Sequence, residues 1–354
     1  MASRRWQCCG LWALALLVVS CAAPSVPAPR GAPAAPTTPV AGAGPSQPAP
    51  ARVRAAYAGL TVAMAPIWVA QDGGLFARHG LDVDLSATPA GDQGIAALIA
   101  GDLDFVQIAG STTAAAIVGG ADLVVVATTL RTLVQSLVVR PEITRGEDLR
   151  GKAVGISRYG TSTDTAAQLA LQHLGLVPLQ DTAILQIGSV PEILSALSTS
   201  AVQGGILSYP TITLARRQGY HELVDVAALG REYAFTGIST RRALVREQAA
   251  HVRAFVQAEV EAIARLKREP EWAKPIIARY LRTEDAELVD EAYTVYVTRY
   301  LERVPAPTRS SMQAVLDELA GANPRAATID PAQLFDDRFV RELEHSGFID
   351  ALYR

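Results

Sequence analysis

Short apolar runs that alternate with helical segments of about ten residues constrain the fold of this chain more than any other feature. The alternation starts near Ala55 and occurs in two series, one ending near Ala127 and one running from Asp148 to Val226. Strands and helices that alternate in this way form parallel βαβ units. Two such series in a chain of 354 residues predict an α/β fold with two lobes and a cleft between them.

Each series gives four expected strands separated by three expected helices. In the first series we expect strands over 58–64, 81–86, 105–108 and 123–127, and helices over 66–74, 91–100 and 111–118. In the second we expect strands over 153–157, 183–187, 205–208 and 223–226, and helices over 163–174, 190–198 and 211–218. Two extended segments at the borders, 137–140 and 235–240, are predicted to cross between the lobes and to act as the hinge.

Beyond Arg241 the chain becomes helical and charged. Apolar residues at helical spacing predict helices over 246–268, 271–280, 285–302, 310–319 and 335–346. The simplest arrangement packs this tail on the first lobe. The predicted division is therefore 55–140 plus 241–354 for lobe 1, and 141–240 for lobe 2.

The first 21 residues have the pattern of an export signal. Arg4 and Arg5 precede an apolar run over 11–19, which is too short to span a bilayer. The sequence Val-Val-Ser-Cys that ends at Cys21 resembles the lipobox of bacterial lipoproteins, in which the signal is cut before the cysteine and its thiol is lipidated. We therefore expect a signal peptide over 1–20, lipidation of Cys21, and a membrane-anchored protein in the periplasm or at the cell surface. The alternative is an ordinary secretory signal with a chance cysteine.

A segment rich in proline and alanine follows, and Arg30 is its only charged residue up to position 51. Proline fixes the backbone φ angle and lacks an N–H group, so this stretch forms neither a helix nor a central strand. Residues 21–54 are predicted to be the lipidated cysteine and a semi-extended tether.

Several classes of function are disfavoured by the composition. All three cysteines lie within the first 21 residues, which excludes a disulfide scaffold, a zinc ribbon or a catalytic thiol in the body of the chain. The net charge of −3 argues against a nucleic-acid partner. The five histidines are scattered without the spacing of metal ligands, so we expect no metal and no cofactor.

Four motifs in a fixed order carry a family resemblance. They lie at 66–76 with 80–83, at 97–105 (ALIAGDLDF), at 148–155 (DLRGKAVG) and at 202–206 (VQGGI). Together they resemble the periplasmic substrate-binding proteins of the nitrate, sulfonate, taurine and thiamine-pyrimidine-precursor class of ABC importers (NMT1/THI5-like and SsuA/TauA-like). The resemblance covers roughly residues 55–300, and the fourth motif lacks the acidic residue that is usual there.

This resemblance implies a type II periplasmic-binding-protein-like fold, with parallel-type sheets flanked by helices and a helical C-terminal tail. It implies a monomer without enzymatic activity that closes on a small polar or anionic ligand and delivers it to an ABC permease. A sulfonate, a nitrate-like anion and a pyrimidine all remain open as the ligand. The alternatives are a ligand-sensing module for a membrane receptor and, less favoured, an enzyme on the same fold.

The ligand is expected at the carboxyl ends of the strands, where open parallel sheets leave a crevice. Four loops lie there, and glycines and hydroxyl side chains at helix starts favour contact with an anion or a carbonyl oxygen. The predicted ligand-binding residues are Met64, Pro66, Trp68, Gly110, Ser111, Thr112, Arg158, Tyr159, Gly160, Thr161, Ser162 and Tyr209. For Trp68 the alternative is packing in the lobe core, for the hydroxyl side chains plain helix capping, and for Arg158 a solvent-facing position.

Overall fold

The computed structural model describes residues 49–88 and 91–354. The predicted signal peptide, Cys21 and most of the predicted tether lie outside these residues. Among the helices of the described part, none is both long enough and apolar enough to cross a membrane.

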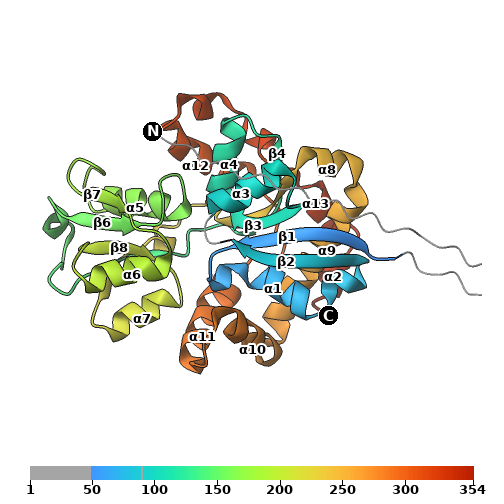
Figure 1. The fold of residues 1–354 in the computed structure, drawn as a ribbon, viewed down its shortest axis with the longest axis horizontal. Coiled ribbons are helices and arrows are strands. Elements are labelled where there is room, and N and C mark those ends of the chain that lie inside the picture. Colours follow the sequence, from blue (N-terminus) through green and yellow to red (C-terminus); the bar gives the residue numbers. More distant parts are fainter. Residues whose placement is uncertain (1–48, 89–90) are drawn as a thin grey trace, which may run out of the picture. The chain divides into compact units, whose positions relative to one another are not determined.

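The first sheet has five strands in the order β2-β1-β3-β10-β4. Figure 1 shows β2, β1 and β3 of this sheet side by side. Their bounds are β1 Ala51–Ala58, β2 Leu81–Thr88, β3 Phe105–Ala109, β4 Leu123–Leu130 and β10 Thr236–Arg241. Strands β2, β1 and β3 run parallel, while β10 is antiparallel to both β3 and β4. Every residue of β4 is buried, which agrees with its nearly continuous aliphatic sequence.

The second sheet also has five strands, in the order β7-β6-β8-β5-β9. Their bounds are β5 Ser136–Val139, β6 Ala153–Ile156, β7 Ala183–Gln186, β8 Gly204–Leu207 and β9 His221–Asp225. Here β6 runs parallel to β7 and β8, and β5 is antiparallel to β8 and β9. The α/β class is confirmed, with two mixed sheets where the sequence led us to expect parallel ones.

The helices of the two series lie between consecutive strands, as expected. They are α1 Ala65–Asp72, α2 Leu75–Arg78, α3 Gly91–Ala100, α4 Gly110–Val118, α5 Ser162–His173, α6 Val190–Ser198 and α7 Thr211–Arg217. Pro66 occupies the first turn of α1, where its missing N–H costs no hydrogen bond. The tail adds α8 Arg242–Glu247, α9 Ala249–Arg268, α10 Pro270–Leu281, α11 Ala286–Tyr293, α12 Arg309–Ala320, α13 Arg338–His345 and α14 Phe348–Ala351.

Each sheet and the helices that pack on it form one half of the described molecule. The two segments that were predicted to cross between the halves are strands inside the sheets. The 137–140 segment lies largely in β5 and belongs to the second sheet, while the 235–240 segment lies largely in β10 and belongs to the first. The chain passes between the sheets just before each of these strands, at 131–135 and at 226–235. A four-residue apolar run looks the same in an extended connection and in a short buried strand, so the sequence did not separate the two.

The first strand is also displaced from its predicted position. β1 covers Ala51–Ala58 and includes residues 51–54, which the sequence placed in the tether. The predicted strand over 58–64 ends instead in a 3-10 turn over Val62–Met64 that leads into α1. Residues 52–55 belong to the strand because their burial alternates: the side chains of Val53 and Ala55 are buried, while those of Arg52 and Arg54 are exposed.

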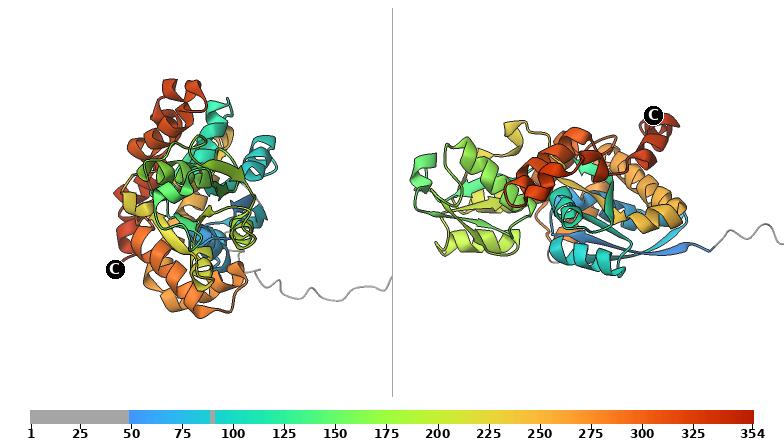
Figure 2. Two further views of the ribbon diagram at one scale, coloured as in Figure 1. Left: turned by 90° about the vertical axis from the view of Figure 1, so that its left-hand side faces the viewer. Right: turned by 90° about the horizontal axis from the view of Figure 1, so that it is seen from above.

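Most of the helical tail packs around the first sheet (Figure 2). Helix α9 contacts α1, α2 and β2, α12 contacts α4, and α13 contacts β4. The tail also reaches the second half, because Glu291 of α11 accepts a hydrogen bond from Thr213 of α7 at 2.5 Å. The predicted helix over 285–302 is divided into α11 and a π-helical turn over Thr294–Tyr300.

Candidate functional site

A cavity of about 830 Å³ is lined by residues that follow strands of both sheets. Ala58, Thr88 and Ala109 end β1, β2 and β3 in the first sheet. Ser157 and Ser208 follow β6 and β8 in the second. The carboxyl ends of the parallel strands in both sheets therefore open into one cleft, which is the place where α/β sheets bind ligands.

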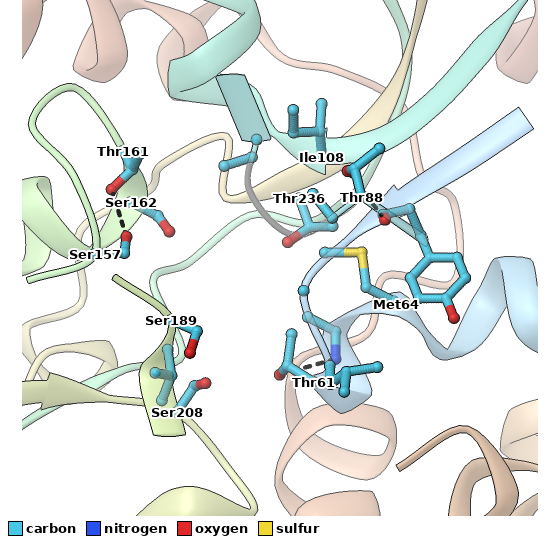
Figure 3. Close-up of a pocket in the computed structure, with 18 of the residues that line it drawn as sticks. Thr61, Met64, Thr88, Ile108, Ser157, Thr161, Ser162, Ser189, Ser208 and Thr236 are labelled. Atoms are coloured by element: carbon cyan, nitrogen blue, oxygen red, sulfur yellow. Dashed lines mark hydrogen bonds between the residues drawn. The ribbon is translucent and has the colours of Figure 1, made fainter. Parts of the chain in front are cut away.

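Hydroxyl side chains make up most of the polar wall of this cleft. Figure 3 shows Thr88 and Thr236 on one side of the open space and Ser157, Thr161 and Ser162 on the other. The hydroxyl residues of the wall are Thr61, Thr88, Thr112, Ser157, Thr161, Ser162, Thr163, Ser189, Ser208 and Thr236. Since a hydroxyl both donates and accepts hydrogen bonds, such a wall suits a polar ligand without fixing the sign of its charge.

The N-termini of four helices also open onto the cleft. Gly91 begins α3, and the N-cap positions of α4, α5 and α6 are occupied by Ala109, Thr161 and Ser189. All four residues line the cavity. The helix dipoles therefore place partial positive charge around one volume. This arrangement favours an anion or an electron-rich oxygen in the cavity.

Backbone donors in the first turns of α4 and α5 are free to meet such a ligand. Neither helix has a side-chain cap at its N-terminus. As in the first turn of any helix, the N–H groups of Thr112 in α4 and of Ser162 and Thr163 in α5 have no acceptor within their own helix. Unsatisfied N–H groups at a helix start need an outside partner, either water or a ligand.

Three hydroxyl groups next to the α5 terminus are bonded to one another. Ser157 Oγ lies 3.0 Å from Thr161 Oγ1 and 2.7 Å from Thr163 Oγ1, and the two threonine oxygens are 3.0 Å apart. Ser157 N–H also donates to Thr163 Oγ1 at 2.9 Å. These bonds hold the turn between β6 and α5 in place, so the free N–H groups of α5 are fixed in direction.

Gln135 adds an acceptor to this wall of donors. Its side chain is only 4% exposed, and its Nε2 donates to Ser162 Oγ at 3.4 Å. Among the lining residues that the structure describes, Gln135 Oε1 is the one buried side-chain atom without a hydrogen-bond partner. An unpaired buried oxygen is costly, and a ligand that donates a hydrogen bond to it removes that cost.

Charged residues lie among the other lining residues, and most of them are paired. Arg158 meets Asp92 of α3 at 3.1 Å, Arg279 is paired with Asp72, and Glu192 accepts from Ser189 Oγ at 2.8 Å. Arg282 lines the cavity and makes no ion pair with any other residue of the described part. Burial raises the pKa of Tyr57, and the positive charge of Arg282 opposes that shift. Arg282 therefore lies near Tyr57 and adds positive charge to the cleft.

Five of the twelve residues predicted from the sequence line the cleft. They are Met64, Thr112, Arg158, Thr161 and Ser162. They come from α4, from the turn before α5 and its first residue, and from the turn before α1, so the structure brings together three of the four loops that the sequence singled out.

Trp68 and Pro66 lie in the core beneath the cleft. The Trp68 indole is fully buried and stacks on Tyr280, with the ring centroids 4.9 Å apart and the planes 5° apart. Tyr57 meets the same indole edge-on at 5.5 Å. Because Tyr57 and Tyr280 themselves line the cavity, Trp68 supports an aromatic wall and does not face the ligand volume.

Gly110 and Ser111 are buried behind the start of α4. A Cβ on Gly110 would lie 2.3 Å from the carbonyl oxygen of Ala234, so this glycine accommodates the second connection between the sheets. Its N–H donates to the carbonyl of Phe235 at 3.1 Å. The sequence predicted that a ligand would approach the backbone closely at this glycine. In the structure the group that approaches it is the carbonyl oxygen of Ala234.

Three further predicted residues do not line the cavity: Tyr159, Gly160 and Tyr209. Tyr159 is 50% exposed, and its hydroxyl donates to the carbonyl of Ile184 in β7 at 2.7 Å. Gly160 has a φ of +73° and donates its N–H to Asp164 at 2.9 Å. Tyr209 lies in a second hollow beside α7 and α11, and burial raises its pKa to about 12.

Several lining residues were not predicted. Gln135 lies in a connection that the sequence left unassigned, and Arg282 lies after a helix of the tail, over 140 residues away. No local pattern marks either of them. Ser189 had a visible signal, because it lies directly before the predicted helix over 190–198. Thr236 lies inside the 235–240 segment that was predicted to cross between the lobes.

Two mixed α/β sheets whose strand ends open into one cleft define the fold of the periplasmic solute-binding proteins. Residues 61–273 match the family model described as NMT1/THI5 like, and the chain belongs to that family. Both the predicted fold class and the predicted family are thereby confirmed.

Individual relatives agree with this assignment. A Brucella abortus protein named as a binding protein is 26% identical over 227 residues, which cover 63% of this chain and 70% of that one. The periplasmic aliphatic sulphonate binding protein SsuA of Escherichia coli has a TM-score of 0.67 at 19% identity, over 81% of this chain and 97% of its own. The periplasmic nitrate-binding protein NrtA of Synechocystis has a TM-score of 0.68 at 14% identity, over 84% and 89%. At these identities the two structures show the shared fold.

Proposed function

We propose that this protein is an extracytoplasmic solute-binding protein that captures a small polar or anionic ligand in the cleft and delivers it to an ABC permease. The observation that carries the proposal is the convergence of four helix N-termini and a hydroxyl-lined wall on one cavity between two sheets. The structural neighbours include a protein named for binding aliphatic sulphonates and a protein named for binding nitrate.

The proposed motion is a closure of two lobes, one built on each sheet, with 131–135 and 226–235 as the connections that bend. In terms of the sequence, lobe 1 then joins β1–β4, β10 and the tail, and lobe 2 contains β5–β9. The Arg158–Asp92 ion pair joins residues of the two lobes across the cavity and is exposed to solvent. Exposed pairs of this kind contribute little free energy, so this contact does not prevent opening.

A thermal-shift screen of the chain without its signal tests the binding function. The compounds are sulfonates, nitrate, bicarbonate, pyrimidines and aromatic acids. A ligand that binds only the folded state raises the melting temperature in proportion to RT ln(1 + [L]/Kd). We expect at least one of these classes to give a saturable shift. A folded protein that none of them stabilises would contradict the proposed ligand class.

The Gln135 acceptor predicts a donor group on the ligand. Gln135→Leu keeps the size of the side chain and removes the unpaired Oε1. For the best ligand of the screen, we expect binding to weaken by about 5- to 100-fold, the cost of one lost hydrogen bond at a buried site. Calorimetry on both proteins measures this ratio. Equal affinity of the two proteins would show that the ligand makes no use of Gln135.

The proposed lipid anchor is tested at Cys21, which lies outside the described residues. Cys21→Ser removes the thiol that lipidation requires, and we expect the variant to appear in the soluble extracytoplasmic fraction. The unchanged protein should sediment with membranes, because several acyl chains together give firm attachment. Sedimentation of the serine variant with membranes to the same extent would rule out anchoring through Cys21.

A further inference from the structure

Three polar side chains meet at a junction between the two halves, away from the cavity wall. They are Glu318 of α12, Tyr233 of the 226–235 connection and Thr165 of α5. Thr165 Oγ1 donates to Glu318 Oε1, and the Tyr233 hydroxyl donates to Glu318 Oε2 at 2.8 Å. The two hydroxyl oxygens lie 2.9 Å from each other. The three groups therefore form a closed ring with three contacts.

This ring joins elements that belong to different sheets. Helix α5 packs on β5, β6 and β8 of the second sheet, whereas α12 packs on α4 beside the first. Tyr233 lies in one of the two connections on which any motion of the halves depends. The same connection is bonded to its surroundings through the N–H groups of Tyr233, Ala234 and Phe235, which donate to the carbonyls of Arg131, Ser311 and Leu130.

Counting hydrogens shows which protonation state the ring needs. Thr165 and Tyr233 each supply one hydrogen, and an ionised carboxylate supplies none. Two hydrogens serve only two of the three contacts, and the hydroxyl oxygens would then face each other at 2.9 Å without a donor. A protonated Glu318 supplies the third hydrogen and completes the ring.

The electrostatic surroundings agree with this count. Burial raises the pKa of Glu318 to about 7, and the negative charge of Asp164 in α5 raises it further. The hydrogen bonds from Thr165 and Tyr233 lower this pKa, as does the positive charge of Arg231 in the connection. Burial and the nearby Glu318 raise the pKa of Tyr233 well above its usual value, so its hydroxyl keeps its hydrogen. Because the carboxyl pKa is raised, the complete ring is favoured at low pH and is lost as the pH rises through about 7.

We propose that Glu318, Tyr233 and Thr165 form a proton-dependent clasp, which ties α12 to α5 when Glu318 is protonated and lets α5 and the 226–235 connection move when the proton leaves. The clasp lies outside the ligand cavity and operates with or without a ligand. It makes the equilibrium between the halves sensitive to pH in the range around 7.

Hydrogen exchange of the ligand-free protein tests the clasp. Exchange is followed by mass spectrometry at pH 6 and pH 8 and corrected for the intrinsic rate, on peptides that cover 231–235 and 162–173. A group with a pKa near 7 in the closed form changes the opening equilibrium about tenfold between these pH values. We expect protection in the unchanged protein to fall about tenfold, and protection in Glu318→Gln to stay constant.

A second variant keeps the test decisive if the glutamine variant folds poorly. Glu318→Met removes the carboxyl group and keeps an unbranched side chain of similar length at the junction. We expect this variant to lose the pH-dependent change as well. Protection that is equal at both pH values in the unchanged protein overturns the clasp, as does a tenfold change that persists in both variants.

Discussion

A tryptophan in place of Ser162 should abolish ligand binding and leave the protein folded. Ser162 is the first residue of α5, lines the cleft and makes one long side-chain hydrogen bond, at 3.4 Å from Gln135. Figure 3 shows its hydroxyl directed into the open space. An indole there fills part of the cavity and covers the free N–H groups of the first turn. Loss of two hydrogen bonds to a charged ligand, at about 1.5–3 kcal/mol each, weakens binding by at least about 100-fold.

The matched control is Ser195→Trp. Ser195 is an exposed serine of α6 that lies outside the cavity. Calorimetry should give unchanged affinity for this variant and no measurable heat for the Ser162 variant, with similar melting temperatures for both. If the Ser162 variant retained full affinity, the ligand would have to bind somewhere other than the described cleft.

Replacing Glu259 by methionine should stabilise the protein at neutral pH. Glu259 lies in α9 with no exposed surface, and neither carboxyl oxygen has a hydrogen-bond partner among the residues described. Burial raises its pKa well above the usual value, so the folded protein holds a proton that the unfolded chain releases. The folded state therefore loses about 1.4 kcal/mol for each pH unit above the unfolded pKa, until the folded pKa is reached.

Methionine removes the ionisable group and keeps an unbranched side chain of similar length. We expect an increase of up to about 3 kcal/mol in the free energy of unfolding at pH 7 and little change at pH 4.5. Urea denaturation at the two pH values measures both. The control is Glu261→Met, two residues away, where the carboxylate is bonded to Arg78 at 2.7 Å and His79 at 2.9 Å. That variant should be less stable than the unchanged protein, and stabilisation of equal size in both would argue against the account of Glu259.

The regular part of the fold was predictable because its signals are local. The helix over 91–100 was predicted with its observed bounds, and the helix over 190–198 likewise. Both have apolar residues at helical spacing, and the second has a serine cap and a proline in the first turn. Strands such as β4 are marked by a run of β-branched residues.

The sheet order and the connections were not predictable, because they depend on pairing between distant segments. Nothing in the sequence of 137–140 shows that this segment pairs with 204–207 and 221–225 rather than spanning two lobes. The same holds for the early start of β1, where Ala51 pairs with Leu81 in a parallel strand. Such pairing is decided by the assembled sheet and not by the residues of one strand.

The candidate site was predictable in its location and only partly in its residues. The rule that ligands bind at the carboxyl ends of parallel strands led to Thr112, Thr161 and Ser162. It could not separate residues facing the cavity from those facing the core, which is why Trp68 and Ser111 were expected in the site and lie behind it. Gln135 reaches the cleft through the connection over 131–135 and Arg282 through the tail, and only the folded chain brings them there.

A crystal structure of the protein with the best ligand of the screen shows directly where that ligand binds. We expect one ligand between the two sheets, with its acceptor atoms on the N–H groups that start α4 and α5 and a donor atom on Gln135 Oε1. A ligand bound with clear density outside this cleft, or within it but away from both helix starts, would show that these helix starts do not form the binding site.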